Sequence, residues 1–357
     1  MNTATPLRLG MVVNRPGLQE RRARGIAGCA PAGTTVDILV APGAVQVAVR
    51  AQRWDATYVI DPGRHGMPAA LASHAMHRPT IVEIGDPQGA LFRAQGRSRP
   101  AIATGWAIDI AIVHRAAGIV FRGADLAATL KPSVPWRFIP DGVDVDLFRP
   151  SESTETRARL GLPPDELVVG TVGTINWSNA RQWAYGLDVV EALGMAAGAP
   201  IRALIVGGGD GVEHLRRRAA ELGVLDRVTL TGARPHGEVP GLLSAMDVCV
   251  STQSNDAIGR GRTTAKLPEY LACDRFVLAT DVGTAGEILA AEMLLPGRTS
   301  FDEAHHRRLA ERLTSLCARR HELRAGAGTR RLALAHFDYA HIAREVDRFV
   351  RETVGRR

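Results

Sequence analysis

Cysteine is scarce in this chain, and its spacing excludes a cross-linked or zinc-bound fold. The 357 residues contain four cysteines, which lie far apart and form no CxxC pair. Disulfide frameworks and structural zinc sites need clustered cysteines. We therefore expect reduced, mostly buried thiols and no metal site. The cysteines are Cys29, Cys249, Cys273 and Cys317.

Long apolar runs are also absent. No stretch of about 18 apolar residues occurs, which excludes a membrane-spanning helix. The first residues, MNTATPLRLGMVV, lack a basic segment followed by a long apolar stretch, so no signal peptide is expected. These two absences predict a cytoplasmic protein.

Aromatic residues are few, at 5%, and the basic residues are scattered rather than clustered. No stacking platform or zinc-finger spacing accompanies them, so we expect no nucleic-acid partner. The chain nevertheless carries 44 Lys+Arg against 37 Asp+Glu, a net charge of +7. This excess favours an anionic ligand and is compatible with peripheral contact at an anionic membrane surface.

The composition that is present, 45% hydrophobic and 23% charged, is that of a globular protein, and the length suits about two domains. Short apolar runs alternate with helical patterns, which is typical of βαβ units with parallel sheets. Helices are expected at Met67–His77, at Ile102–Ala117 and in the last eighteen residues from Phe337. Strands are expected at Leu7–Val13, Val36–Val40, Ala56–Ile60, Thr80–Ile84, Gly118–Phe121, Arg137–Ile139, Leu167–Val172, and in runs that start at Ile201, Arg227, Asp247 and Arg275.

A stretch rich in proline, acidic and small polar residues, Pro150 to Glu166, marks the expected domain junction. We predict a Rossmann-like domain at 1–150, a second one at 151–335, and a C-terminal helix at 336–357. Two domains of similar size imply a cleft between them. Ligands of parallel sheets bind beyond the carboxyl ends of the strands.

The most informative loop, Thr252–Thr264, separates a buried strand from a helix that is expected to begin near Thr264 or Ala265. A helix start with basic side chains suits a diphosphate. Glu269, one turn into the helix, could accept hydrogen bonds from paired hydroxyls such as those of a ribose. The loop reads equally well as a solvated basic segment. Its basic residues are Arg260, Arg262 and Lys266, and its candidate N-caps are Thr263 and Thr264.

Two further loops place glycines directly after a strand: VGTVGTINWSNAR from Val169, and VGGGDG from Val206. Neither matches GxGxxG, so no nicotinamide or flavin cofactor is indicated. Tight packing between strand and helix explains Gly207–Gly209 more simply than a ligand does.

Taken in order, three segments resemble the retaining glycosyltransferases of family 4, which have the GT-B fold. They are IPDGVDVDLFRP from Ile139, RVTLTGARPHGEVPGLLSAMDVCVST from Arg227, and KLPEYLACDRFVLATDVGTAGEI from Lys266. The resemblance covers the second half and the junction, and the first half more loosely. It implies two Rossmann-like domains that face each other across a cleft, and a C-terminal helix that crosses back to the first domain. It also implies a metal-independent enzyme that moves a sugar from a UDP or GDP sugar to an acceptor. The composition, rich in alanine, arginine and glycine, is typical of a high-GC bacterium, and a role in secondary metabolism is expected.

The resemblance assigns donor-binding roles in the second domain. Glu269 takes the place of the second glutamate of the family's E-x7-E motif, which binds the ribose. Arg262–Ala265 takes the place of the backbone around the diphosphate, and Ala233 and Arg234 would lie beside the base. The full donor set is Gly173, Thr174, Arg181, Ala233, Arg234, Arg260, Arg262, Thr263, Thr264, Lys266, Leu267 and Glu269.

The sequence departs from the family pattern at three places. Gly261 stands where E-x7-E has its first glutamate, and Thr174 stands where an arginine is usual, with Arg181 displaced from the position of a lysine. We expect Lys266, with Arg260 or Arg262, to replace the missing charge, because a buried diphosphate needs positive partners.

The third departure is in the first domain, where Asp86 replaces the family's histidine. It would orient the acceptor or act as its base, although a plain turn aspartate fits equally well. The candidate acceptor-binding residues are Asn14, Arg15, Gly17, His65 and Asp86.

Three functional hypotheses follow from these residues. The leading one is transfer to a small natural product or thiol, with a glycan or lipid acceptor as an alternative. The second is a sugar-nucleotide 2-epimerase. The third is a catalytically degenerate sugar-nucleotide-binding protein or partner subunit, which the glycine at position 261 favours.

Overall fold

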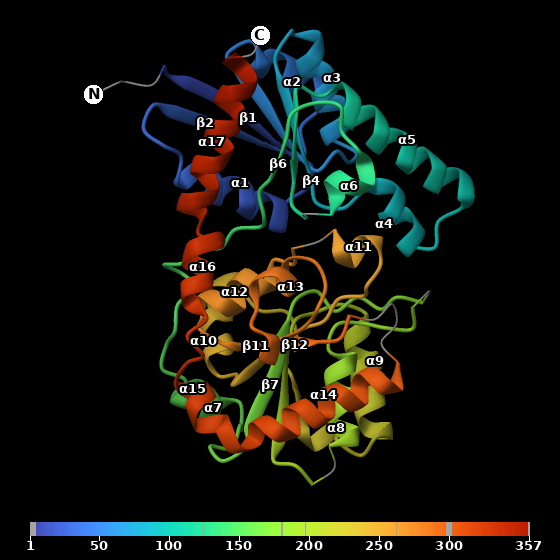
Figure 1. Ribbon diagram of the computed structural model, residues 1–357, viewed down its shortest axis with the longest axis vertical. Helices are drawn as coiled ribbons and strands as arrows, with labels where there is room; N and C mark the ends of the chain where they lie inside the picture. The colour runs from blue at the N-terminus through green and yellow to red at the C-terminus, as the bar shows by residue number, and fades with distance from the viewer. Residues whose placement is uncertain are drawn as a thin grey trace. The chain divides into compact units, whose positions relative to one another are not determined.

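The computed structural model describes residues 5–123, 125–179, 181–196, 198–261, 263–297 and 302–355. These residues form two α/β units, each with its own parallel sheet (Figure 1). Unit 1 consists of Met1–Asp144, Arg260–Thr263 and His336–Arg357. Unit 2 consists of Val145–Gly259 and Thr264–Ala335.

Unit 1 contains a six-stranded sheet in the order β2-β1-β3-β4-β5-β6, with every neighbouring pair parallel. All six expected strands are present, within two residues of their predicted bounds. The strands are β1 Leu7–Val13, β2 Thr34–Val40, β3 Ala56–Ile60, β4 Thr80–Ile84, β5 Gly118–Phe121 and β6 Trp136–Phe138. The helices are α1 Leu18–Gly28, α2 Ala44–Ala51, α3 Gly66–Ala75, α4 Gln88–Ala94, α5 Arg99–Arg115, α6 Leu126–Leu130 and α17 Tyr339–Gly355.

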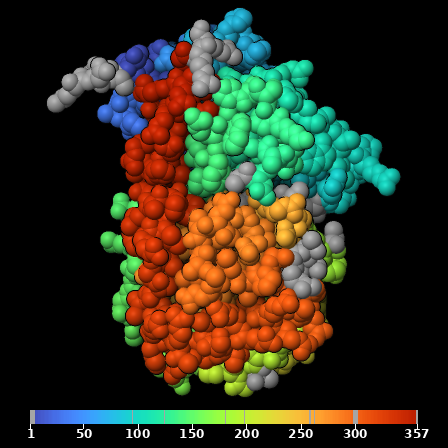
Figure 2. Space-filling view, viewed as in Figure 1, coloured from blue at the N-terminus to red at the C-terminus, as the bar shows by residue number. Residues whose placement is uncertain are grey.

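The C-terminal helix α17 packs on unit 1, as the sequence predicted. Its apolar side chains Ile342, Val346 and Phe349 recur at helical intervals and are at most 2% exposed. They join the core on the α1 face of the sheet, and α17 lies beside α1 in Figure 1. The opposite face of α17 is on the surface, where Figure 2 shows it as a continuous ridge.

Unit 2 also contains a six-stranded parallel sheet, in the order β12-β11-β10-β7-β8-β9. Five strands were expected; β12 has two residues and was not. The strands are β7 Leu167–Val172, β8 Ile201–Val206, β9 Val228–Leu230, β10 Val248–Ser251, β11 Phe276–Thr280 and β12 Leu294–Leu295. The helices are α7 Thr154–Arg159, α8 Leu187–Met195, α9 Gly211–Glu221, α10 Val239–Ser244, α11 Ala257–Arg260, α12 Lys266–Ala272, α13 Thr284–Ile288, α14 Glu303–Leu316, α15 Arg320–Ala325 and α16 Arg330–His336. The 3-10 turns are η1 Leu225–Arg227, η2 His236–Glu238, η3 Ala291–Met293 and η4 Cys317–Arg319.

The four cysteines are free thiols. Cys249 and Cys273 are buried, Cys317 is half-buried and Cys29 is exposed, so the expectation of mostly buried thiols holds for the first two. Burial raises the pKa of Cys273 to about 12. None of the helices in the described ranges combines the length and the apolar character that a membrane crossing requires.

Unit 1 buries a network of charged side chains at the carboxyl end of its sheet. Glu83, within strand β4, is fully buried, and both of its oxygens accept from Arg22 Nε of helix α1, at 2.8 and 2.9 Å. Tyr58 donates its hydroxyl to Glu83 at 2.7 Å. Burial alone would lower the pKa of Arg22, but the carboxylates of Glu83 and Asp141 raise it.

Arg122, directly after strand β5, extends this network to the neighbouring loops. Its Nη2 donates to both oxygens of Asp61, at 2.9 and 2.8 Å, and its Nη1 donates to Asp141 at 3.2 Å. Arg22 also donates to the carbonyls of Ile139 and Pro140. The network therefore holds the segment that leaves the last strand of the sheet.

Replacing Glu83 by glutamine is expected to destabilise unit 1 strongly. The change keeps the shape but leaves the buried Arg22 without its main counter-charge, which costs about 3–5 kcal/mol. Asp55→Asn is the matched control, because its partner Arg8 has a side chain that is 63% exposed. Thermal unfolding of both variants measures the effect. Similar melting temperatures for the two would contradict the assigned role of Glu83.

Asp109 of helix α5 should make the stability of unit 1 depend on pH. Its side chain is fully buried and accepts from the Gly89 N–H at 3.1 Å, and burial raises its pKa to about 6. The folded state therefore keeps a proton that the unfolded chain releases above its ordinary pKa near 4. Stability from this group is complete below about pH 4 and is lost as the pH rises through 6.

Asp109→Asn removes this dependence. We expect the variant to match the parent near pH 4 and to be more stable at pH 8 by up to about 3 kcal/mol. Melting temperatures across this range measure it. An advantage of the variant that did not grow between pH 4 and pH 8 would show that Asp109 is not held neutral.

Candidate functional site

The candidate site lies in unit 2, at the edge where its parallel strands end. The loops after β7, β8, β9 and β10 all leave the sheet at this edge, where α/β proteins bind their ligands. Gly173 follows β7 with φ 145°, and Gly207 follows β8 with φ 152°. A Cβ on Gly207 would lie 1.8 Å from the Gly173 carbonyl, and one on Gly209 would lie 2.3 Å from the Ile175 carbonyl. Gly207 and Gly209 therefore allow two loops to pack together. Their role is structural, as expected, but the close contact is between two loops and not between a strand and a helix.

Among the described basic residues expected to bind the diphosphate, Lys266 points toward the loop that begins with Gly173. It begins helix α12, is 8% exposed, and its Nζ lies 3.3 Å from the centre of the Tyr185 ring. A Cβ on Gly173 would lie 3.8 Å from this Nζ. The aromatic ring attracts the ammonium group and holds it at the loop. The arrangement places one nearly buried positive charge beside a backbone that a ligand can approach closely.

Gly173 offers space at this site rather than a hydrogen-bond donor. Its N–H donates to the carbonyl of Val206 at 3.0 Å. Thr174, the next residue, is exposed and brings no positive charge. Any diphosphate bound here would therefore depend on Lys266 for its charge compensation.

The two threonines before α12 do not cap it, which corrects the sequence prediction. The N-cap is Ala265, and no side chain makes a capping hydrogen bond there. The hydroxyls of Thr264 and Ser251 share a hydrogen bond of 3.3 Å, and Thr263 belongs to unit 1, where its hydroxyl donates to the Arg122 carbonyl at 2.9 Å. Each hydroxyl found a partner outside the helix, and sequence spacing does not report such partners.

The other basic residues expected to compensate the diphosphate charge lie in different surroundings. Arg181 donates to Ser254 at 3.0 Å and to Asp256 at 2.8 Å, so it ties two loops of this edge together. Arg260 belongs to unit 1 and lies 3.8 Å from Asp125. Arg262 lies outside the described residues. Leu267 is 1% exposed and its N–H donates to the Thr264 carbonyl, so it supports the start of α12.

Glu269, one turn into α12, has a partner that sequence reasoning missed. Its Oε1 lies 3.1 Å from Nε2 of His236, in the 3-10 turn η2, and the His236 ring packs on Phe148 with centroids 5.0 Å apart. Ala233 and Arg234, the candidates for the base side, are exposed in the loop just before this turn. The sequence offered one hint of this partner: His236 follows Arg234, a candidate donor-binding residue, by only two positions.

The acceptor candidates lie in loops at the carboxyl edge of the unit 1 sheet. Asn14 accepts from the backbone N–H groups of His65 at 2.8 Å and Gly66 at 3.4 Å, so it holds the start of helix α3. Arg15 and Gly17 are exposed. His65 is half-buried, with Nδ1 3.2 Å from the Pro42 carbonyl.

Asp86 is half-buried directly after strand β4, and its charge is among those that raise the pKa of Arg122. It therefore lies beside the buried network of Glu83, Arg122 and Asp61. Sequence reasoning missed this network. The sequence offered one local hint of it: a charged residue, Glu83, interrupts the otherwise apolar strand TIVEI.

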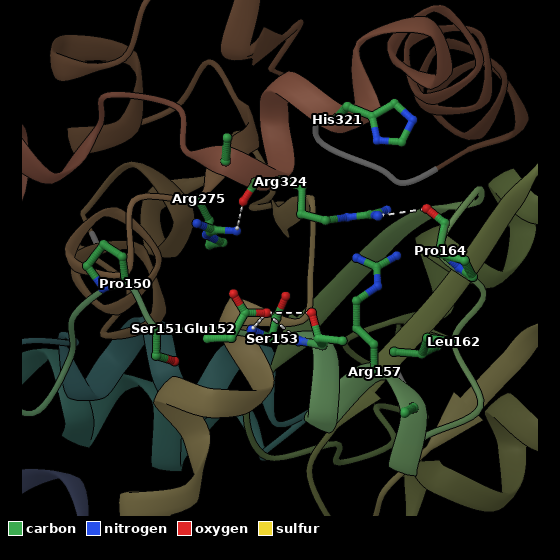
Figure 3. Close-up of a pocket in the computed structure, with 13 residues that line it drawn as sticks. Pro150, Ser151, Glu152, Ser153, Arg157, Leu162, Pro164, Arg275, His321 and Arg324 are labelled. Atoms are coloured by element: carbon green, nitrogen blue, oxygen red, sulfur yellow. Dashed lines mark hydrogen bonds between the residues drawn. The ribbon is translucent and has the colours of Figure 1, made fainter.

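A cavity of about 790 Å³ lies at the other edge of the unit 2 sheet, where β10 and β11 begin. Figure 3 shows the guanidinium groups of Arg157 and Arg324 side by side in it. Both bind Asp247, at 3.1 and 3.0 Å, and they also donate to backbone carbonyls of residues 163–166. These arginines fasten the expected domain junction to unit 2, and the cavity is separate from the Lys266 site.

Lys266→Met should weaken binding of UDP and GDP by about ten- to a hundred-fold, because it removes a charged donor of about 1.5–3 kcal/mol while it keeps the volume of the side chain. Calorimetric titration measures the affinity. The chain's other lysine, Lys131, is exposed in unit 1, and Lys131→Met is the control that should bind as the parent does. Unchanged affinity in Lys266→Met would exclude this site as the diphosphate site.

Comparisons with known proteins find relatives of unit 2 in sequence and of the whole chain in fold. The family model described as glycosyl transferases group 1 matches residues 166–318, within unit 2. A D-inositol 3-phosphate glycosyltransferase of Stackebrandtia nassauensis is 31% identical over 57% of this chain and 46% of its own length. A 2-deoxystreptamine N-acetyl-D-glucosaminyltransferase of Streptomyces fradiae is 26% identical over 77% and 65%. The chain spans about half the length of the first of these relatives.

Among solved structures, Anabaena HepE in complex with UDP and glucose matches with a TM-score of 0.76 and 18% identity, over 97% of this chain and 100% of that one. At this identity the match shows the fold. These matches support the resemblance seen in the sequence: residues 166–318 match the glycosyl transferases group 1 model, and the chain has the two-sheet GT-B fold.

Proposed function

We propose that the protein transfers a sugar from a nucleoside diphosphate sugar, with UDP or GDP as the nucleotide, to a small-molecule acceptor. The observation that carries the proposal is the position of Lys266 against the Gly173 loop, with Glu269 one turn further along the same helix. Lys266 would compensate the diphosphate and Glu269 would accept from the ribose hydroxyls. The UDP and glucose named for the Anabaena structure support a donor of this class.

Transfer would retain the configuration of the anomeric carbon without an enzymic nucleophile. The leaving diphosphate stays on the face that the acceptor approaches and helps to accept its proton. The protein then acts by positioning the two substrates and by stabilising the negative charge that develops on the leaving group. Lys266 is the side chain that we assign to this charge, and the proposed mechanism requires no metal ion.

Unit 1 would bind the acceptor, with Asp86 orienting it or accepting its proton. The curated relatives are named for D-inositol 3-phosphate and 2-deoxystreptamine, both small polyhydroxylated six-membered rings. A ring of this kind is the acceptor class that we propose. Asn14 and His65 lie at the same edge of the sheet as Asp86, in the loops after β1 and before α3.

A second candidate function is sugar-nucleotide binding without transfer. Gly261 favours it, because the family's motif has a carboxylate at that position. In this case nucleotide sugars would bind and no product would form with any acceptor.

Incubation with UDP-glucose, UDP-N-acetylglucosamine or GDP-mannose and a panel of cyclitols and aminocyclitols tests the proposal by mass spectrometry. We expect a glycosylated acceptor whose anomeric configuration, measured by NMR, equals that of the donor. Asp86→Asn should lower kcat more than it changes the donor KM, since it removes a proton acceptor and keeps the shape. Binding without product would favour the second candidate, and an epimerised sugar formed without acceptor would indicate a 2-epimerase.

A further inference from the structure

His236 and Glu269 come from different parts of unit 2 and meet through one hydrogen bond. His236 lies in the turn after β9, and Glu269 lies in α12. The Nε2 to Oε1 distance is 3.1 Å. A carboxylate can only accept, so Nε2 carries the proton and donates it. One oxygen of Glu269 is thereby held, and its other oxygen makes no hydrogen bond to the residues that the structure describes.

The ring of His236 is supported from behind by a fully packed residue. Phe148 is 1% exposed, and its ring centroid lies 5.0 Å from that of His236 with an angle of 56° between the planes. Edge-to-face and tilted contacts of this kind are favourable. They restrict the orientation of the His236 ring, and so the direction in which Nε2 donates.

The support of His236 is linked to the helix that carries Glu269. Arg330 donates through Nη1 to the carbonyl of Phe148 at 2.8 Å and to the carbonyl of Ala272, the last residue of α12, at 2.6 Å. Its Nη2 donates to the carbonyl of Val145 at 2.8 Å. Arg330 therefore links the residue under the His236 ring to the C-terminal end of the helix that carries Glu269.

The His236–Glu269 pair contributes little to the folding free energy. The side chains are 33% and 14% exposed, and partly exposed ion or hydrogen-bonded pairs contribute about 0–1 kcal/mol to folding. The orientation of the carboxylate, by contrast, matters to any ligand that must donate to it through two groups at once. A vicinal diol is such a ligand, because its two hydroxyls fit the two oxygens of one carboxylate.

We infer that His236 is a positioning residue: it fixes the carboxylate of Glu269, to which the proposed function already assigns the ribose hydroxyls, and the fixed carboxylate is what makes the site disfavour 2′-deoxynucleotide sugars. The inference rests on the proposed function. It adds a residue that acts through Glu269 and a class of donor that the site rejects. A site built to receive a hydroxyl discriminates against the analogue that lacks it, because its own polar group is left unpaired.

Calorimetric titration with UDP and 2′-deoxy-UDP, and with GDP and 2′-deoxy-GDP, tests the inference. The parent should bind one ribonucleotide at least about ten-fold more tightly than its 2′-deoxy form. His236→Ala should weaken the ribonucleotide and bring this ratio to within about three-fold, since a mobile carboxylate no longer separates the two. His236→Gln, whose amide can donate to the same oxygen, should restore most of the ratio.

Two further variants separate orientation from other effects. Glu238→Ala, exposed on the same turn η2, should leave both affinities and their ratio unchanged. Lys266→Met should weaken the ribose and deoxyribose forms equally, because the diphosphate is common to both. Two results would overturn the inference. One is a His236→Ala variant that keeps the parent's full preference for the ribonucleotide over its 2′-deoxy form. The other is a parent protein that binds the two forms equally well.

The proposed function fails by a different result. If neither UDP nor GDP binds the parent protein, the donor site itself is wrong. If one of them binds through Lys266 but shows no preference over its 2′-deoxy form, the donor site stands and the role of His236 is rejected.

Discussion

Parallel pairing of every strand is the constraint on which the candidate site depends. It brings the ends of β7, β8, β9 and β10 to one edge of the unit 2 sheet, so that Gly173, Gly207 and the loop before His236 become neighbours. The same pairing brings the strand starts together at the other edge, where Asp247 and its arginines hold the junction segment. The strand starts are thus held by structural contacts, and the candidate ligand site lies at the edge where the strands end.

Buried charge has a different purpose in each unit. In unit 1, Arg22 and Arg122 share Glu83, Asp61 and Asp141, and the network joins a helix, three strand ends and the segment after the sheet. Such a network is costly to break and adds little compared with apolar packing, so its value is to fix loop positions. In unit 2, Nζ of Lys266 lies over the Tyr185 ring and beside Gly173. This arrangement suits the binding of an anion rather than the joining of structural segments.

Sequence reasoning reached the fold and two central residues of the candidate site, Lys266 and Glu269, because both depend on local order along the chain. Strands appeared as short apolar runs, and the helix at Lys266 followed a long polar loop. The same reasoning placed Thr263 and Thr264 as helix caps, although their hydroxyls bind elsewhere. It missed His236 because its partner lies 33 residues further along the chain, and it missed the Arg122 network for the same reason.

The sequence by itself determined the two parallel α/β units, the amphipathic C-terminal helix, and the family that they resemble, since hydrophobic periodicity and motif order are properties of the chain. The tertiary structure alone decided which polar groups meet. Lys266 reaches Gly173, His236 reaches Glu269, and Arg22 reaches Glu83 only after distant segments pack, and hydrogen bonds form over about 3 Å whatever the separation in sequence.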